Sequence, residues 1–229
     1  MNEHSIIPTL SQEWIFWNSI TVFFILFILK VSRSKSRSVQ NKIISVFITI
    51  MILEFISIHS YYIYQGIWTI QDSLPFHLCR IMWFVGLFLL LTRNQIAFEL
   101  SLFIGMIGGF HSLLTPELTH GTTLFTTIDY FLVHGGLIAI PFFCLFSLGM
   151  RPRKMAWLRS FLYLQIFVFI AAIADYILGA NYMYLSAKPH VNNPFLIGDW
   201  PYYILGLEIA TLLHAILVYI PFYYKKSFL

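Results

Sequence analysis

The segment that decides the fold is residues 23–55, FFILFILKVSRSKSRSVQNKIISVFITIMILEF. Two apolar stretches flank a short basic segment that contains Arg33, Lys35 and Arg37. An apolar run of about 20 residues is long enough to cross the hydrocarbon core of a bilayer as a helix. A basic loop between two such runs is typical of a membrane hairpin whose turn lies in the cytoplasm. The segment therefore predicts a pair of transmembrane helices.

The composition extends this interpretation to the whole chain. Of 229 residues, 59% are hydrophobic, 18% are aromatic and 10% are charged. Soluble domains contain about 25% charged residues, so this chain cannot cover a water-facing surface with charge. A soluble globular enzyme and a disordered protein are therefore excluded, and two cysteines are too few for a disulfide-stapled secreted domain. The composition indicates a small integral membrane protein.

Seven apolar stretches with polar boundaries predict an all-α bundle of seven transmembrane helices in a single domain, residues 1–229. The stretches lack the alternation of a membrane barrel, and a helix satisfies its own backbone hydrogen bonds in lipid. The predicted spans are residues 14–31, 43–64, 75–92, 96–114, 128–148, 158–180 and 201–222. The polar residues 1–11 lack a basic signal-peptide region, so the first span is expected to remain in the mature protein.

The basic residues predict the orientation of the bundle. Apart from Arg80 and Lys188, every lysine and arginine lies in segments that a seven-span chain places on one side. The positive-inside rule assigns that side to the cytoplasm, with the N-terminus outside and the C-terminus inside. We therefore expect a multi-pass protein of the cell membrane, with no nucleic acid among its partners. The sequence does not indicate an oligomeric state.

Ionisable groups inside the spans are the candidate functional residues, because each costs roughly 2.5–3.5 kcal/mol at the bilayer centre. With a rise of about 1.5 Å per residue, six helices each place one polar or nucleophilic group about 5 to 10 Å below the outer surface. These groups are His59, Cys79, His111, His134, Asp175 and Glu208. Glu54 is placed deeper, while Glu99 and His214 fall outside this layer. We predict that the six groups line one cavity open toward the outer leaflet; the alternative is separate interhelical hydrogen bonds.

Cys79 and His134 are the candidate nucleophile and general base, a common pairing of thiol and imidazole. Pro75 is expected to be the first helical residue of its span, which places Cys79 just past the first turn. The helix N-terminus and Arg80 then favour a thiolate, although simple packing of the cysteine is equally compatible. His77 is expected to share a helix face with Arg80 rather than with Cys79.

Other features bear on packing and on alternative functions. The Gly108-Gly109 and Gly135-Gly136 pairs are expected at close helix contacts. No pair of histidines has the i, i+4 spacing of metal ligands, so no metal and no cofactor is expected. A second interpretation is a small-solute or proton-coupled transporter with Glu54, His59, Asp175 and Glu208 as a relay; a third is a non-catalytic membrane binding subunit. The lack of repeat halves and of interrupted spans weighs against transport.

Five sequence strings carry a family resemblance. They are LPFHLCR (74–80), LTPEL (114–118), VHGG (133–136), GANYMY (179–184) and WPYY (200–203). Together they resemble the YwaF-like family of bacterial integral membrane proteins and, more distantly, the animal transmembrane protein 164 family. Animal members are implicated in phospholipid acyl transfer with a membrane cysteine as acyl carrier and a histidine partner. Cys79 matches that cysteine, and His134 is the matching histidine.

The resemblance implies a membrane-embedded lipid acyltransferase, transacylase or hydrolase with membrane phospholipid as its substrate. The depth of Cys79 is that of the ester bonds of glycerolipids, and acyl transfer there needs a nucleophile, a base and oxyanion donors. Arg80 is the candidate oxyanion donor or, alternatively, the group that holds a lipid phosphate. Asp175, Glu208 or His111 is the candidate that orients His134.

Overall fold

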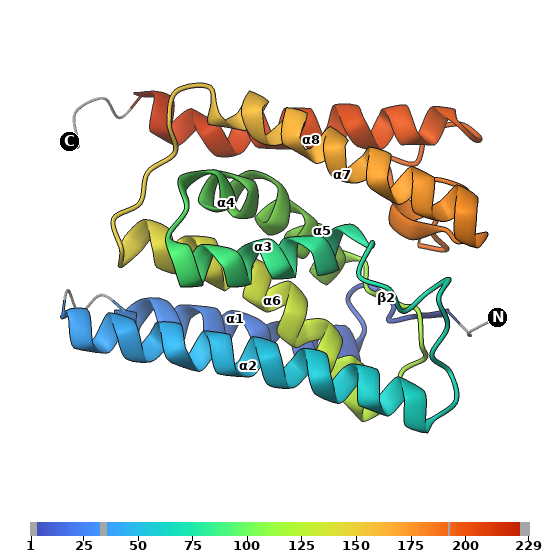
Figure 1. Cartoon of the computed structure of the whole chain (residues 1–229), viewed down its shortest axis with the longest axis horizontal. Coiled ribbons are helices and arrows are strands. Elements are labelled where there is room, and N and C mark those ends of the chain that lie inside the picture. Colours follow the sequence, from blue (N-terminus) through green and yellow to red (C-terminus); the bar gives the residue numbers. More distant parts are fainter. Residues whose placement is uncertain (1–3, 33–35, 192, 225–229) are drawn as a thin grey trace.

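The computed structural model describes residues 4–32, 36–191 and 193–224, which form an all-α bundle of seven helical stretches (Figure 1). In chain order they are α1 (Gln12–Ser32), α2 (Arg37–Tyr64), α3 (Leu78–Thr92), the continuous α4–η1–α5 (Gln95–Leu100, Ser101–Gly105, Met106–Leu114), α6 (Leu124–Phe146), α7 (Ala156–Leu178) and α8 (Tyr202–Tyr224). The predicted all-α class is confirmed.

Six of these stretches are long and apolar enough to cross a membrane, whereas α3 has only 15 residues. Its length of roughly 22 Å is short of the roughly 30 Å of a hydrocarbon core. The prediction that Pro75 is the first helical residue was wrong, because α3 begins at Leu78 with His77 as its extended N-cap. The preceding residues instead form turns, in which Ser73 N–H donates to the Thr69 carbonyl. Seven crossings and the orientation of the termini stay predictions.

The end of α1, the start of α2 and the α3–α4 and α6–α7 connections lie at one end of the bundle, opposite strands β1 and β2 (Figure 1). Gln40, near the start of α2, donates a 2.7 Å hydrogen bond to the Ser147 carbonyl after α6. Glu99 of α4 accepts from the Arg153 guanidinium at 2.9 Å and lies 3.5 Å from the Arg159 guanidinium. Charge segregation of this kind is what the positive-inside interpretation requires.

Helix α6 lies at the centre and packs against α1, α3 and α5 (Figure 1). Each of the two predicted glycine pairs contains a glycine that allows a neighbouring helix to approach α5 or α6 closely. A Cβ atom on Gly109 of α5 would lie 2.7 Å from the carbonyl oxygen of His134, and one on Gly136 of α6 would lie 2.4 Å from the Trp83 ring. Gly108 differs, because its Cβ atom would meet only the Cys79 sulfur, at 3.8 Å. The close helix contacts predicted from these glycines are therefore confirmed, with Gly108 as the looser member.

The N-terminal end of the bundle is closed by loops rather than by helices. Strand β1 (Ser5–Ile6) pairs antiparallel with β2 (Glu117–Leu118), with Ser5 opposite Leu118. The connection between α7 and α8 begins with a 3₁₀ turn, η2 (Tyr182–Tyr184). Two fully buried tyrosines fix it: the Tyr182 hydroxyl donates to the Ile70 carbonyl at 2.7 Å, and the Tyr203 hydroxyl donates to the Tyr184 carbonyl at 2.6 Å. The loop thereby folds back over this end of the bundle.

The stretch Gln95–Leu114 contains an irregularity that the sequence did not indicate. Its central five residues, Ser101–Gly105, form a π-helical turn, and all five are buried. Such turns occur inside α-helices and are frequent near functional sites. Here the turn separates the ion-paired Glu99 of α4 from the part of α5 that carries Gly108, His111 and Ser112.

Candidate functional site: a cavity at the loop-covered end

A cavity of about 380 Å³ lies beneath the loops at the N-terminal end of the bundle. Seven of the residues singled out from the sequence line it: His59, His77, Cys79, Arg80, His111, His134 and Glu208. The long connection after η2 also contributes Pro189, Val191 and Leu196 to its wall. The predicted layer of polar groups therefore surrounds one common space, with the exception of Asp175.

Asp175 does not line this cavity, contrary to the prediction of a shared wall. Its carboxylate accepts a 2.7 Å hydrogen bond from the backbone N–H of Tyr182, and its carbonyl accepts from Ala180 N–H at 3.2 Å. The side chain thus satisfies one backbone donor, Tyr182 N–H, at the start of η2. Depth alone did not reveal this, because it fixes the height of a residue and not the direction of its side chain.

Cys79 lies in the first turn of α3, closer to the helix start than predicted. Its half-buried sulfur is 3.7 Å from the Ser112 hydroxyl of α5. A Cβ atom on Gly108 of α5 would lie 3.8 Å from the sulfur, an ordinary van der Waals distance. The other cysteine, Cys144, is fully buried in the apolar core near the opposite end of α6.

His134 is buried on α6, and its Nδ1 lies 2.7 Å from the carbonyl oxygen of Tyr130. Because a carbonyl only accepts, Nδ1 carries the proton in this arrangement, and Nε2 of the neutral ring is an acceptor. The Tyr130 ring lies 4.1 Å from the imidazole, and its hydroxyl donates to the Ser112 carbonyl at 2.9 Å. Ser112 therefore contacts both Cys79 and the tyrosine that holds His134. Within the described residues, no direct hydrogen bond joins Cys79 to His134.

Arg80 occupies a buried ion-pair network at the side of the cavity. One guanidinium nitrogen pairs with Glu54 of α2, and another lies 2.7 Å from Asp129 of α6. The second oxygen of Glu54 accepts from the Trp83 indole at 2.7 Å. Two carboxylates thus oppose one guanidinium. To support a thiolate, an oxyanion or a lipid phosphate, Arg80 would have to release one of these two carboxylates. Glu54 would likewise have to leave Arg80 and Trp83 before it could carry a proton in a relay.

Sequence reasoning missed Asp129, the second acid of this network. It lies one turn into α6, at the boundary of the predicted span, and was passed over for that reason. A buried arginine beside a single glutamate is a signal that a further acid is near, because charges removed from water need compensation. The two carboxylates therefore explain why an arginine can be buried at position 80 without any role in ligand binding.

His111 and His214 form a perpendicular pair with ring centroids 4.8 Å apart. The prediction that His214 lies outside the polar layer was wrong about its height, because its ring contacts that of His111, a member of the layer. It assumed that every helix ends at the same plane, whereas α5 ends beneath the loops and α8 extends past it (Figure 1). Nearby, Glu208 accepts a 2.8 Å hydrogen bond from Gln165 of α7.

A histidine that the sequence analysis missed is His120, in the loop between β2 and α6. Its ring stacks on Tyr62 with centroids 4.0 Å apart, and its Nε2 lies 3.4 Å from the Ser73 hydroxyl. Burial lowers the pKa of His120 to about 4, against a raising contribution from Asp72. His120 was missed because only the predicted spans were searched for ionisable groups.

The cavity wall combines these polar groups with aliphatic side chains. Leu78, Val133, Leu164, Val168 and Leu207 are among its lining residues. A wall of this kind suits an amphipathic molecule, with apolar surface for a chain and a few polar groups for orientation. The apolar helices and this cavity together define a multi-pass membrane protein with a cavity of mixed polar and aliphatic lining near one end.

The family follows from the chain as a whole. Residues 8–219 match the TMEM164 family, and the protein belongs to this family. It is the family that the sequence strings resembled more distantly; the match does not show the bacterial YwaF-like assignment. No curated protein and no solved structure matches the chain.

Proposed function

We propose that the protein is a membrane-embedded lipid acyltransferase in which Cys79 is the nucleophile and His134 is the general base. The observation that carries this proposal is that both side chains line one cavity and are bridged through Ser112 and Tyr130. Thiol and imidazole are a common nucleophile and base. The resemblance to the animal members of the family points to the same two positions.

The first half-reaction transfers an acyl group from a phospholipid ester to the cysteine. Nε2 of His134 takes the Cys79 proton, and the sulfur attacks the ester carbonyl carbon. The tetrahedral intermediate collapses with loss of the lysophospholipid oxygen, which receives the proton from His134. A thioester at Cys79 remains, and the histidine is again neutral, while Nδ1–H donates to the Tyr130 carbonyl throughout.

The second half-reaction returns the acyl group to an acceptor. His134 removes the proton of an acceptor hydroxyl, whose oxygen attacks the thioester carbonyl. The sulfur leaves and recovers the proton from His134, so that the enzyme is regenerated. A lysophospholipid acceptor gives acyl exchange, and water gives hydrolysis.

The most direct test is mass spectrometry of the intact protein after incubation with phospholipid vesicles. The expected result is an adduct with the mass of one acyl chain, released by hydroxylamine as a thioester should be. Cys79→Ala should abolish the adduct, whereas the matched Cys144→Ala should retain it, because Cys144 is buried away from the cavity. An adduct that persists in Cys79→Ala would overturn the proposed nucleophile.

Transport of a small solute is the second candidate, favoured by the charged network of Glu54, Arg80 and Asp129 within the bundle. If the protein is a transporter, the cavity holds the solute and Cys79 has only a packing role. Reconstituted vesicles distinguish the two functions. Transport predicts solute uptake that survives Cys79→Ala and is lost in Asp129→Asn, whereas acyl transfer predicts lipid exchange that is lost in Cys79→Ala.

A further inference from the structure

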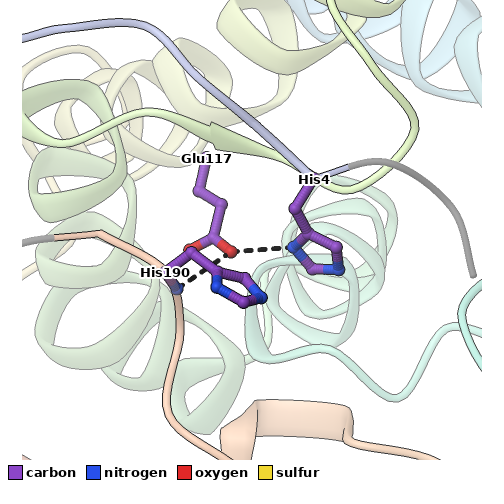
Figure 2. A group of neighbouring side chains, drawn as sticks. All are labelled: His4, Glu117 and His190. Atoms are coloured by element: carbon purple, nitrogen blue, oxygen red, sulfur yellow. Dashed lines mark hydrogen bonds and ion pairs between the residues drawn. The ribbon is translucent and has the colours of Figure 1, made fainter.

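Three segments that are far apart in the chain meet at a cluster of His4, Glu117 and His190 (Figure 2). His4 precedes β1, Glu117 lies in β2, and His190 belongs to the connection between α7 and α8. One potential ligand atom from each residue lies within 4.8 Å of the other two. The two imidazole rings are 5.2 Å apart and lie edge to face. The cluster is outside the groups assigned to acyl transfer.

Glu117 is the unusual member of this cluster, because its carboxylate is buried with only 5% of the side chain exposed. Its Oε1 lies 2.8 Å from Nδ1 of His4 and accepts a 3.2 Å hydrogen bond from the backbone N–H of His190. Its Oε2 is buried and accepts no hydrogen bond of 3.5 Å or less from the residues that the structure describes, although the Tyr184 hydroxyl lies near the carboxylate. Among the described residues, the one ion-pair partner of Glu117 is His4. Burial of a carboxylate oxygen without a hydrogen bond is energetically costly, and a bound cation would compensate this cost.

We propose that His4, Glu117 and His190 bind a divalent transition metal ion, with Zn²⁺ as the best match. Two imidazoles and one carboxylate are a ligand set that zinc accepts, and the mixture of nitrogen and oxygen disfavours calcium and magnesium. Neighbouring ligands of a tetrahedral zinc ion lie about 3.3 Å apart. The cluster is compatible with this spacing: His4 Nδ1 and Glu117 Oε1 are 2.8 Å apart, and one potential ligand atom from each of the three residues lies within 4.8 Å of the others. Binding therefore requires only small side-chain shifts.

The metal ion would fasten the loops that close the cavity. Glu117 itself lines the cavity, as do Pro189 and Val191 on either side of His190. A shared ion would join the N-terminal segment, β2 and this loop by three coordination bonds. This role differs from the chemistry at Cys79, so either proposal can fail without the other.

The competing explanation is an ion pair in which His4 is protonated and no metal is needed. In that case one imidazolium neutralises Glu117, and His190 is a bystander. The two explanations differ in what they require of His190, because only the metal site needs its side chain. They also differ in their response to a chelator.

The test uses the full-length protein in detergent micelles, purified without a polyhistidine tag and stripped with EDTA. After incubation with ZnCl₂ and removal of free ion, bound zinc is counted by plasma mass spectrometry, and affinity is measured by competition with a zinc indicator. The expected result is one zinc ion per chain. His4→Ala and His190→Ala should each weaken binding by about tenfold or more. The matched control His120→Ala, a histidine of a neighbouring loop outside the cluster, should bind as the wild type does.

Thermal unfolding guards against variants that are simply misfolded. Without metal, His190→Ala should unfold near the wild-type midpoint, whereas His4→Ala, which removes the ion-pair partner of the buried Glu117 carboxylate, should unfold at a lower temperature. Zinc should raise the midpoint of the wild type and of His120→Ala only, since a ligand stabilises the state that binds it. Unchanged zinc affinity in the double variant His4→Ala His190→Ala would overturn the proposal. So would a stripped wild type that takes up no zinc.

Discussion

Nδ1 of His134 lies 2.7 Å from the carbonyl oxygen of Tyr130, one turn earlier on the same helix. The orienting partner of the imidazole is therefore its own backbone, whereas the sequence analysis offered Asp175, Glu208 or His111 for that role. The hydrogen bond fixes the tautomer without a carboxylate. It also leaves Nε2 as the nitrogen available for a thiol.

If Cys79 and His134 act as a unit, their substitutions should not add. Cys79→Ala and His134→Ala should each reduce acyl exchange to background in reconstituted vesicles, and the double variant should be little worse than either. Glu208→Gln should keep most activity, because Glu208 is bonded to Gln165 rather than to the imidazole. Multiplicative losses in the double variant would show that the two residues act separately.

The buried network around Arg80 predicts an ordered series of stabilities. Arg80→Met strands the carboxylates of Glu54 and Asp129 and should lower the free energy of unfolding by about 3–5 kcal/mol. The triple variant Glu54→Gln Arg80→Met Asp129→Asn should be less destabilised, since no charge is left unpaired. Thermal unfolding in detergent measures both, with Lys42→Ala, at the exposed basic end, as a near-neutral control. A triple variant less stable than Arg80→Met would contradict this explanation.

Adjacent glycines on α5 offer a matched pair for the helix contact with α6. Gly109→Ala forces a Cβ atom to 2.7 Å from the His134 carbonyl oxygen and should cost about 1–3 kcal/mol of stability. Gly108→Ala meets only the Cys79 sulfur at 3.8 Å, so it should be neutral or slightly stabilising through its better helix propensity. Equal effects of the two substitutions on the unfolding midpoint would refute the close contact.

The lowered pKa of His120 predicts a pH dependence of stability. Burial, the largest cause, holds the pKa at about 4 in the folded protein, below its ordinary value of 6.5. The unfolded chain therefore binds the proton more readily, and stability that is complete above pH 6.5 should be lost as the pH falls toward 4. His120→Gln cannot titrate, so its unfolding midpoint should fall less between pH 7 and pH 4.5. Parallel curves for the two proteins would exclude this contribution.

Cysteine labelling tests the orientation and the crossing of α3 together. In a background lacking Cys79 and Cys144, Ser186→Cys should react with an impermeant maleimide on intact cells, and Ser36→Cys only after permeabilisation. Five helical stretches separate these exposed positions. Four of them are long enough to span, so if those four cross, the two positions lie on opposite sides only if α3 crosses as well. Labelling of both from the same side would show that α3 does not span.

The fold was predictable because the bilayer imposes length and polarity on every span. Hydropathy alone located all seven helical stretches, and the charges of their connections agree with the arrangement of the helix ends. The start of α3 was not predictable in this way. Proline at 75 is compatible with a first helical turn, but tertiary bonds such as that from the Leu74 N–H to the Tyr182 hydroxyl favour a turn there instead.

The sequence predicted which residues line the candidate site better than it predicted which of them contact one another. Depth along each helix brought Cys79, His111 and His134 to one cavity, because polar groups in lipid gather where they can satisfy one another. Depth carries no information about loops, so His120 and the cluster of His4, Glu117 and His190 escaped notice. It also carries none about rotation around the helix axis, which turns Asp175 toward a backbone amide.

The π-helical turn of residues Ser101–Gly105 has a further consequence for the register of the chain. An α-helix advances by about 100° per residue, so a wider turn behaves as a one-residue insertion that rotates everything after it. Deleting a single residue there would restore a regular helix and swing His111 and Ser112 away from the cavity. The length of this buried helix, rather than any one side chain in it, thus determines which face of α5 meets Cys79.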